Sequence, residues 1–136
     1  MNNFISTGAV NHLALTVTDL ARSERFYTNL LGFQKVMDLS ATRVLLANSG
    51  GVILALTTAS DPDQAPANDS FNENRVGLDH LSFSVANHAS LVEATRLLDQ
   101  NGVQHGEIKD LGGLKMYVLA FRDPDNIQLE LTAPHA

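Results

Sequence analysis

Two histidines and one glutamate are the residues of this sequence best suited to chemistry. His12 and His80 each stand in a segment where apolar and polar residues alternate, and Glu130 stands between two leucines in a third such segment. Alternation with a period of two is typical of a strand with one buried face, so all three side chains are expected on polar faces. Imidazole and carboxylate are common ligands of catalytic metals, and the residues therefore suggest a site for a divalent ion such as Fe, Mn, Zn or Ni.

A plainer interpretation of each residue stays open. A single histidine on a strand is more often a packed or surface residue than a ligand, and a strand glutamate is more often solvated or paired with Arg or Lys. The metal hypothesis depends on the coincidence of all three residues on like faces of equivalent strands. If the two halves of the chain curl their sheets in the same way, these faces line one concave surface on which the three side chains converge.

The elements that must position these residues form an internal repeat of the pattern β-α-β-β-β. The first copy has strands at residues 10–17, 33–39, 42–47 and 52–58 and a helix at 20–31. The second copy has strands at 78–85, 104–111, 114–121 and 127–132 and a helix at 89–100. At the last strand the segment LALT overlays the segment LELT, so that Ala55 corresponds to Glu130.

The repeat indicates an α+β protein with one domain. Module one occupies about residues 8–59, a linker residues 60–76, and module two about residues 77–134. The linker reads SDPDQAPANDSFNENRV and is rich in Asp, Asn, Pro and Ser, which is typical of a surface linker or lid. Asp19 and Asn87 are expected to cap the two helices, and Gly32 and Gly102 are expected to end them.

Composition excludes several classes of protein. The 136 residues are 44% hydrophobic and 18% charged, which is enough for a packed core. A net charge of −6 with no basic run argues against nucleic acid as a partner. No cysteine is present, which excludes thiol nucleophiles, disulfides and cysteine-based zinc sites. Since the sequence shows neither a signal-peptide pattern nor an apolar run of about 20 residues, a soluble, cytoplasmic protein is expected, with no membrane partner.

Three stretches carry a family resemblance. The segments VNHLALTVTDLARSERFYTNLLGF, GLDHLSFSV and FRDPDNIQLEL are similar to the vicinal oxygen chelate superfamily, which includes glyoxalase I, extradiol dioxygenases, fosfomycin-resistance enzymes and bleomycin-binding proteins. The resemblance implies two βαβββ modules forming a cupped mixed sheet around a central site. It places His12, His80 and Glu130 on three of the four metal-ligand positions. The fourth position holds Ala55, which cannot ligate, whereas similar glyoxalase I enzymes have a glutamate there.

The missing fourth ligand bears on the reaction that the resemblance implies. Glyoxalase I uses a metal-bound glutamate as a proton shuttle, so that activity is not expected. Two histidines and one glutamate resemble instead the ligand set of extradiol dioxygenases and fosfomycin-resistance transferases. We expect a metal-dependent enzyme that binds a small oxygenated substrate through vicinal oxygens, with dioxygenase-like or lyase/isomerase-like chemistry favoured over thiol transfer. The alternative is a metal-free small-molecule binding or resistance protein of the bleomycin-binding type.

Further residues are candidates for contact with the substrate. Tyr117 is the catalytic candidate, because a tyrosine in extradiol enzymes points its hydroxyl at the metal-bound substrate, although a strand tyrosine more often only packs. Arg122 either pairs with Asp123 or Asp125, which is the commoner outcome, or reaches an anionic substrate. The side chains expected to face the cup and to orient ligands or substrate are Thr57, Ser82 and Gln128.

The three remaining histidines are not expected to bind the metal. His88, His105 and His135 match no ligand position and are expected on the surface. The resemblance implies a homodimer in which His12 of one chain can meet His80 and Glu130 of the other.

Overall fold

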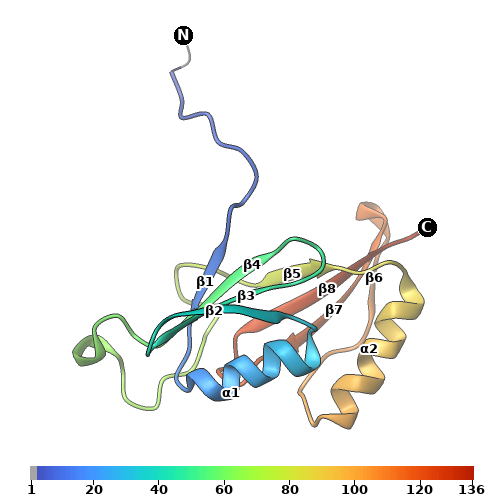
Figure 1. Ribbon diagram of the computed structural model, residues 1–136. Helices are drawn as coiled ribbons and strands as arrows, with labels where there is room; N and C mark the ends of the chain where they lie inside the picture. Colours follow the sequence, from blue (N-terminus) through green and yellow to red (C-terminus); the bar gives the residue numbers. More distant parts are fainter. Residues whose placement is uncertain (1–2) are drawn as a thin grey trace. The chain divides into compact units, whose positions relative to one another are not determined.

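The structure is a computed structural model, and it describes residues 3–136. Contacts divide the chain into two units, Met1–Ala65 and Pro66–Ala136. Each unit holds one four-stranded mixed sheet, with strand order β1-β4-β3-β2 in the first and β5-β8-β7-β6 in the second (Figure 1). In each sheet the first and last strands of the module are parallel neighbours. The predicted α+β fold with two βαβββ modules is therefore confirmed.

The first unit follows the predicted order of elements. Its strands and helix are β1 (Leu13–Thr16), α1 (Leu20–Arg25), β2 (Gln34–Ser40), β3 (Arg43–Ala47) and β4 (Ile53–Thr57). The Asp19 carboxylate accepts a hydrogen bond from the Arg22 amide at 3.1 Å and so caps α1. The predicted helix continues past α1 as a π-helical segment, Phe26–Leu30, and the chain then turns at Gly32 with φ of +74°. The expected cap and stop are both confirmed.

Leucines and valines on one face of the first sheet form the core of this unit. Leu54 and Leu56 of β4 and Val44 and Leu46 of β3 are fully buried, and α1 packs on these two strands. The opposite face carries the alternate residues, and the register sets Ala14 of β1 beside Ala55. The predicted separation of an apolar helix side from a second face is therefore correct.

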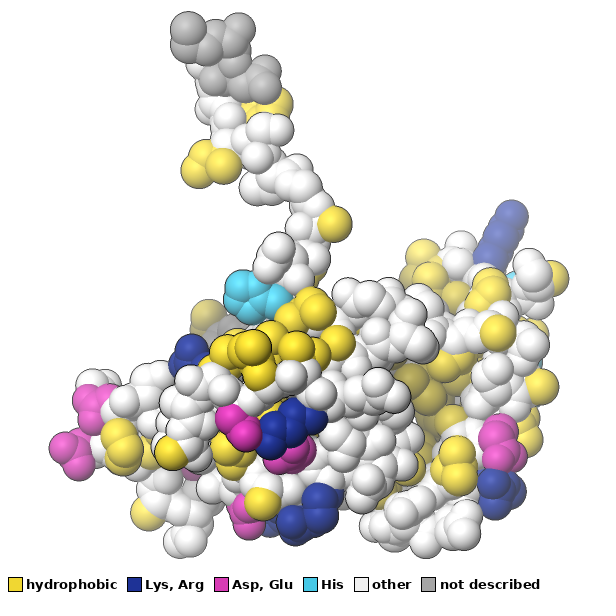
Figure 2. Space-filling view, viewed as in Figure 1, with side chains coloured by type: hydrophobic (Ala, Val, Ile, Leu, Met, Phe, Trp, Pro, Cys, Tyr) yellow, Lys and Arg dark blue, Asp and Glu magenta, His cyan; other side chains and the backbone are white. Residues whose placement is uncertain are grey.

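Strand β2 lies at the outer edge of the first sheet and is exposed along its whole length. Its pairing with β3 shifts register twice, which marks two irregularities in the ladder. Three apolar side chains of this strand, Val36, Met37 and Leu39, are about half exposed. Figure 2 shows hydrophobic side chains on the surface of the first unit, with charged side chains among them. Lys35 and Asp38 of β2 form an ion pair at 2.7 Å.

The second unit repeats the pattern with a longer helix. Its elements are β5 (Leu81–Ser84), α2 (His88–Gln100), β6 (Lys109–Leu111), β7 (Met116–Arg122) and β8 (Gln128–Pro134). The Asn87 side chain accepts a hydrogen bond from the Ser90 amide at 3.0 Å and caps α2 as predicted. Leu91 and Leu98 are buried where α2 packs on β7 and β8.

Three predicted boundaries in this unit are wrong. Strand β5 begins at Leu81 and not at residue 78, so that His80 lies before the strand. The segment 104–111 forms a strand only at Lys109–Leu111, together with a single bridge between His105 and Phe121. The next strand begins at Met116, because Gly112–Leu114 forms a 3-10 turn and Lys115 follows with φ of +55°. A left-handed residue at this point cannot continue an extended strand.

Residues 60–76 are more ordered than their composition suggests. The boundary between the units falls in this segment, after a short 3-10 turn at Pro62–Gln64. Its second part is tied to the turn between β7 and β8: the Phe71 amide donates to the Asp125 carbonyl at 2.9 Å, and the Asn126 side chain donates to the Phe71 carbonyl at 3.0 Å. Asn126 has φ of +66°, a left-handed conformation that asparagine tolerates in turns. In the part of the chain that the structure describes, no helix is long and apolar enough to cross a membrane.

Candidate metal centre

The second unit brings His80 and Glu130 together. Parallel pairing of β5 with β8 sets Ser82 beside Glu130, and antiparallel pairing sets Ala120 of β7 on its other side. Leu129 and Leu131, the neighbours of Glu130 in sequence, point to the other face, where Leu129 is fully buried. His80 immediately precedes β5, and its Nε2 lies 3.7 Å from Glu130 Oε1. The sheet therefore delivers an imidazole and a carboxylate to one point on the face away from α2.

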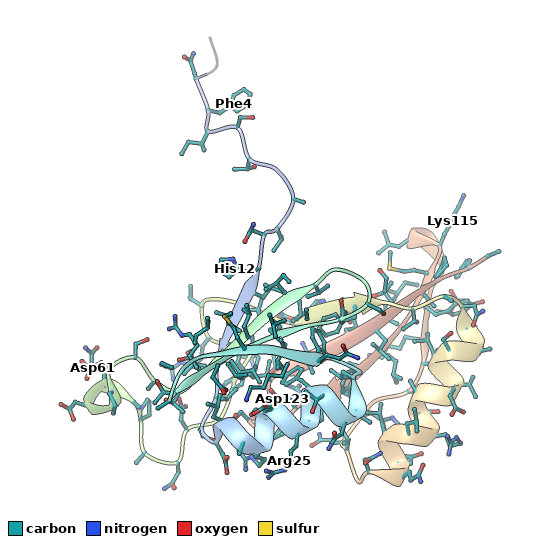
Figure 3. The ribbon with its side chains drawn as sticks, in the orientation of Figure 1. Phe4, His12, Arg25, Asp61, Lys115 and Asp123 are labelled. Carbon is teal, nitrogen blue, oxygen red and sulfur yellow. The ribbon has the colours of Figure 1, made fainter. Side chains whose placement is uncertain are left out.

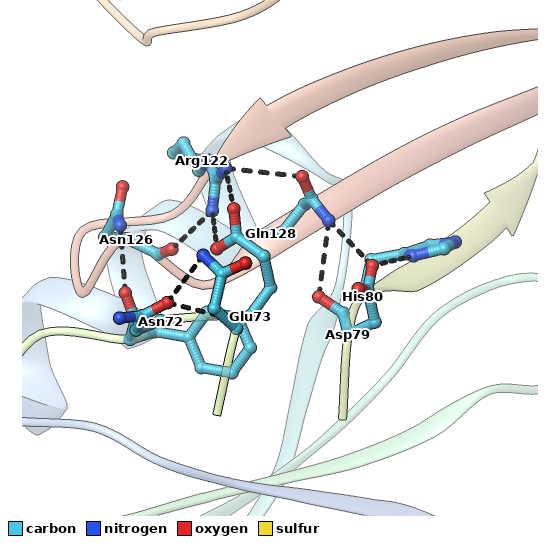
Figure 4. Close-up of polar contacts among 9 residues, drawn as sticks. Asn72, Glu73, Asp79, His80, Arg122, Asn126 and Gln128 are labelled. Atoms are coloured by element: carbon cyan, nitrogen blue, oxygen red, sulfur yellow. Dashed lines mark hydrogen bonds and ion pairs between the residues drawn. The ribbon is translucent and has the colours of Figure 1, made fainter. Parts of the chain in front are cut away.

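The other ring nitrogen of His80 is occupied. Nδ1 lies 2.7 Å from Asp79 Oδ1, and the same carboxylate oxygen accepts a hydrogen bond from Gln128 Nε2 at 3.1 Å. Gln128 Oε1 in turn accepts from Arg122 Nη2 at 3.3 Å (Figure 4). Because a carboxylate only accepts, His80 carries its proton on Nδ1 and turns Nε2 toward Glu130.

A pair of hydroxyls supports Glu130. Thr132 Oγ1 donates to Glu130 Oε1 at 3.5 Å, and Ser82 Oγ lies 2.5 Å from Thr132 Oγ1. Since the Thr132 proton points at the carboxylate, Ser82 is the donor in the second bond. Ser82, predicted to orient ligands or substrate, thus acts in this structure on the carboxylate through Thr132.

His12 belongs to the first unit and has a similar local setting. It lies just before β1, where the N-terminal segment leaves the sheet of its unit (Figure 3), and not within a strand as predicted. Its Nδ1 is 2.7 Å from Asn11 Oδ1. The repeat-equivalent of Glu130, Ala55, is buried between Ala14 and Leu45. Within the described part of either unit, no three His, Asp or Glu side chains gather as a ligand set.

Tyr117 does not lie beside the His80–Glu130 pair. The β7–β8 register pairs Tyr117 with Ala133, so its side chain lies on the face of the sheet that α2 covers. Glu130 lies on the opposite face. The Tyr117 ring packs between the rings of His88 and His135, with centroid separations of 4.8 and 4.6 Å. The expectation that Tyr117 points at a bound substrate from this sheet is therefore corrected, because side chains of adjacent strand residues point to opposite faces.

Arg122 is engaged by a partner that its sequence neighbourhood does not reveal. It binds Glu73 through two hydrogen bonds, Nη1 to Oε2 at 2.9 Å and Nη2 to Oε1 at 2.8 Å. This ion pair lowers the pKa of Glu73 to about 2. The expected pairing with Asp123 or Asp125 is corrected, because the Asp123 carboxylate accepts instead from the Asp125 and Ile127 amides within the turn.

Thr57 lies at a pocket of the first unit. It is nearly buried, its hydroxyl donates to the Thr58 carbonyl at 2.9 Å, and it lines a pocket of about 370 Å³. The same pocket contains Arg43, which the register places beside Thr57. Among the described residues the Arg43 side chain has no hydrogen bond or ion pair. Sequence reasoning missed Arg43, although an arginine at the start of an otherwise apolar strand, RVLLA, was a signal.

The donor set of His80 and Glu130 fits a divalent metal. At 3.7 Å the two atoms are too far apart for a hydrogen bond, so each keeps a lone pair available to a metal. A neutral imidazole nitrogen and a carboxylate oxygen are ligands that Zn, Mn, Fe and Ni accept, and both are held by neighbouring hydrogen bonds. Two protein ligands from one unit leave room for a third.

The order of strands in each sheet, repeated in two modules with a histidine before the first strand, defines a vicinal oxygen chelate fold. The chain belongs to the Glyoxalase/Bleomycin resistance protein/Dioxygenase superfamily, which matches residues 9–131. It is similar to a solved glyoxylase/bleomycin resistance protein/dioxygenase domain from Frankia sp. EAN1pec, with 34% identity, a TM-score of 0.82, and coverage of 95% of this chain and 93% of that one.

Two curated relatives are similar at lower identity. An uncharacterized protein of Bacillus subtilis, YwkD, is 27% identical over 90% of this chain and 94% of its own length. The metallothiol transferase FosB of Staphylococcus saprophyticus is 26% identical over 90% of this chain and 75% of its own length. The family predicted from the sequence is thus confirmed, and the superfamily includes enzymes.

Proposed function

We propose that the protein is a metal-dependent enzyme of this superfamily that binds a small oxygenated substrate through vicinal oxygens. The observation that carries the proposal is the His80–Glu130 pair, in which Nε2 and Oε1 face each other without a hydrogen bond. Side chains that served only for packing would not need to be a carboxylate and an imidazole held in this way. The relative FosB is named a metallothiol transferase, which supports the same conclusion.

His80 and Glu130 would hold the metal, with His12 as the proposed third ligand. A bound divalent ion supplies Lewis-acid stabilisation of negative charge on substrate oxygens. The chain's own residues do the positioning: Asp79 holds the His80 ring, and Thr132 and Ser82 hold the Glu130 carboxylate. Ala55 adds no ligand, which leaves space for the substrate's oxygens.

We propose separately that the pocket beside Thr57, within the first unit, binds an anionic group. It is lined by hydroxyls and by one guanidinium, and no carboxylate lines it. In a protein with a net charge of −6, an arginine without a partner among the described residues is a specific anchor for a carboxylate or phosphonate. Titration with methylphosphonate, followed by amide NMR, should shift the Thr57 and Thr58 signals in the native protein and not in Arg43→Gln.

Metal binding tests the proposal directly. Calorimetric titration of metal-free protein with Mn²⁺ and Zn²⁺ should show binding that His80→Ala and Glu130→Ala each weaken at least tenfold. His135→Ala is the matched control, because this histidine bonds Asp110 on another part of the sheet, and it should bind metal normally. Equal affinity in all four proteins would overturn the metal site. A protein that binds no metal but still binds small oxygenated ligands would be a binding protein of the bleomycin-binding type.

The homodimer is proposed on the same basis. His12 lies in a different unit from His80 and Glu130, so a second chain can supply it. Sedimentation equilibrium of the full chain should give twice the chain mass of 14.7 kDa, and a monomer that binds metal through all three residues would contradict the dimer.

A further inference from the structure

In each of the two predicted histidine ligands, Nδ1 is hydrogen-bonded to the side chain of the preceding residue, and the other three histidines lack this bond. His12 Nδ1 lies 2.7 Å from Asn11 Oδ1, and His80 Nδ1 lies 2.7 Å from Asp79 Oδ1. In both cases the partner is the residue immediately before the histidine. The arrangement therefore recurs at the same position of both modules, each within its own unit.

We propose that Asn11 and Asp79 are positioning residues that hold the two histidines through Nδ1 and so fix Nε2 as the nitrogen that binds the metal. The inference rests on the proposed function for its purpose and on the hydrogen bonds for its geometry. An amide oxygen or a carboxylate oxygen accepts only, so the shared proton belongs to Nδ1. A neutral ring protonated at Nδ1 keeps its lone pair on Nε2, where a metal binds.

The other three histidines do not have this combination of a hydrogen-bonded Nδ1 and an open Nε2. His105 uses both ring nitrogens, Nδ1 at 2.7 Å from the Gly106 carbonyl and Nε2 at 2.6 Å from Asp99. His135 uses Nε2 itself, at 2.7 Å from Asp110. His88 packs its ring edge-on against Tyr117. Of the five histidines, His12 and His80 alone combine a held Nδ1 with an Nε2 that makes no hydrogen bond in the described structure.

The two supports differ in strength. Asp79 is itself held: Gln128 Nε2 donates to its carboxylate at 3.1 Å and to its carbonyl at 3.3 Å. Gln128 is in turn bound by Arg122, which forms an ion pair with Glu73 from the second part of the linker (Figure 4). For Asn11, no side-chain hydrogen bond other than that to His12 is found among the described residues. A carboxylate that is itself oriented should hold and polarise its imidazole more strongly than a lone amide.

The ring tautomers of the metal-free protein test the inference without any activity assay. Long-range ¹H–¹⁵N correlation spectra at a pH where the rings are neutral should show both His12 and His80 protonated at Nδ1. Asp79→Ala should move the His80 proton to Nε2, and Asn11→Ala should do the same for His12. Asp79→Asn keeps an acceptor and should leave the His80 tautomer unchanged, and Asp110→Ala, the matched control, should affect neither ring.

Metal affinity provides the second measurement. Asp79→Ala should weaken Mn²⁺ or Zn²⁺ binding about 10- to 100-fold, which is the usual effect of removing an outer partner of a ligating histidine. Asp79→Asn and Gln128→Ala should cost less, and Asp110→Ala nothing. Because the Asp79 side chain is 66% exposed, its loss should leave the fold intact, which circular dichroism will verify.

The two proposals fail in different ways. Unchanged tautomers and unchanged metal affinity in Asp79→Ala and Asn11→Ala would overturn the positioning role, even if His80→Ala abolished metal binding. A different result would overturn the metal site and keep the positioning role. In that case the ring proton would move from Nδ1 in Asp79→Ala and Asn11→Ala, but metal affinity would not depend on His80 or Glu130.

Discussion

Arg122, the last residue of β7, and Glu73, in the second part of the linker, form a two-point ion pair between parts of the chain that lie far apart in sequence. Both side chains are about three-quarters buried, and Arg122 also donates to the Asn126 carbonyl at 3.2 Å. The pair therefore fastens residues 71–73 to the turn between β7 and β8, next to the hydrogen bonds that reach His80.

This ion pair predicts acid sensitivity of the second unit. The pKa of Glu73 falls from 4.5 to about 2 in the folded protein, chiefly because Arg122 donates hydrogen bonds to it. A lowered folded-state pKa stabilises the protein above the ordinary value, and that contribution is lost as the pH falls from about 4.5 toward 2. Thermal unfolding should show Glu73→Gln less stable than the native protein at pH 7, with the difference vanishing near pH 2. Glu93→Gln, which breaks an exposed pair with Arg96, should change stability far less at pH 7.

His105 predicts a stability change of opposite sign. Its pKa is raised above 6.5, first because of Asp99 and then because of the Gly106 carbonyl, since both ring nitrogens donate. A raised folded-state pKa stabilises the protein below about 6.5 and loses its effect as the pH rises through the folded value. Urea unfolding should therefore show that His105→Gln destabilises more at pH 5.5 than at pH 8.5. An equal loss at both values would contradict the protonated state.

Ser23 predicts a stabilising substitution. It lies on the buried side of α1, and among the described residues its hydroxyl is the buried side-chain group that lacks a hydrogen-bond partner. Ser23→Ala removes that cost and adds helix propensity, so the free energy of unfolding should rise by about 1 kcal/mol. Ser90→Ala is the matched control: its hydroxyl bonds Asn87 at the start of α2, and its loss should lower stability. Urea unfolding of the two variants should give shifts of opposite sign.

A glutamate introduced at position 55 is expected to act as a fourth metal ligand. A glutamate at this buried position, the repeat-equivalent of Glu130, places an unpaired carboxylate in the sheet and should lower the melting temperature of the metal-free protein by several degrees. Added Mn²⁺ should then raise the melting temperature of Ala55→Glu more than that of the native protein. Ala55→Gln has the same size without the charge and should show no larger metal effect than the native protein. Identical metal-induced shifts in all three proteins would exclude position 55 from the site.

The proposed sharing of the site between two chains predicts complementation. His12→Ala and His80→Ala homodimers should each lack complete sites. A mixed dimer purified through two different tags should regain one intact site of two, and so bind about half the metal of the native dimer. Absence of any recovery, in a mixed dimer shown to have formed, would place all three ligands in one chain.

Sequence alone was sufficient for the features that depend on local patterns. Alternation placed Glu130 on the face away from its leucines, and Asp19, Asn87 and Gly32 marked helix ends correctly, because caps and left-handed stops act within a few residues. The start of β1 was placed too early, because alternation continues to Val10 although hydrogen-bonded pairing with β4 begins only at Leu13.

Features that depend on register or on distant partners could not be predicted in this way. Whether Tyr117 shares a face with Glu130 depends on how β7 pairs with β8, and a shift of one residue reverses the answer. The partner of Arg122 is 49 residues away, in a segment whose composition suggests only a loop. The hydroxyl support of Glu130 likewise joins Ser82 and Thr132 across two strands that are adjacent only in the folded unit.

The irregular β2 strand has a consequence for the behaviour of the protein at high concentration. An exposed edge carrying Val36, Met37 and Leu39 has the composition from which intermolecular strand addition begins. Its two register shifts interrupt the even spacing of outward amides that an incoming strand requires, and the Lys35–Asp38 pair sets charge on the same edge. The irregularities that make β2 a poor strand therefore protect the chain against growing into a continuous intermolecular sheet.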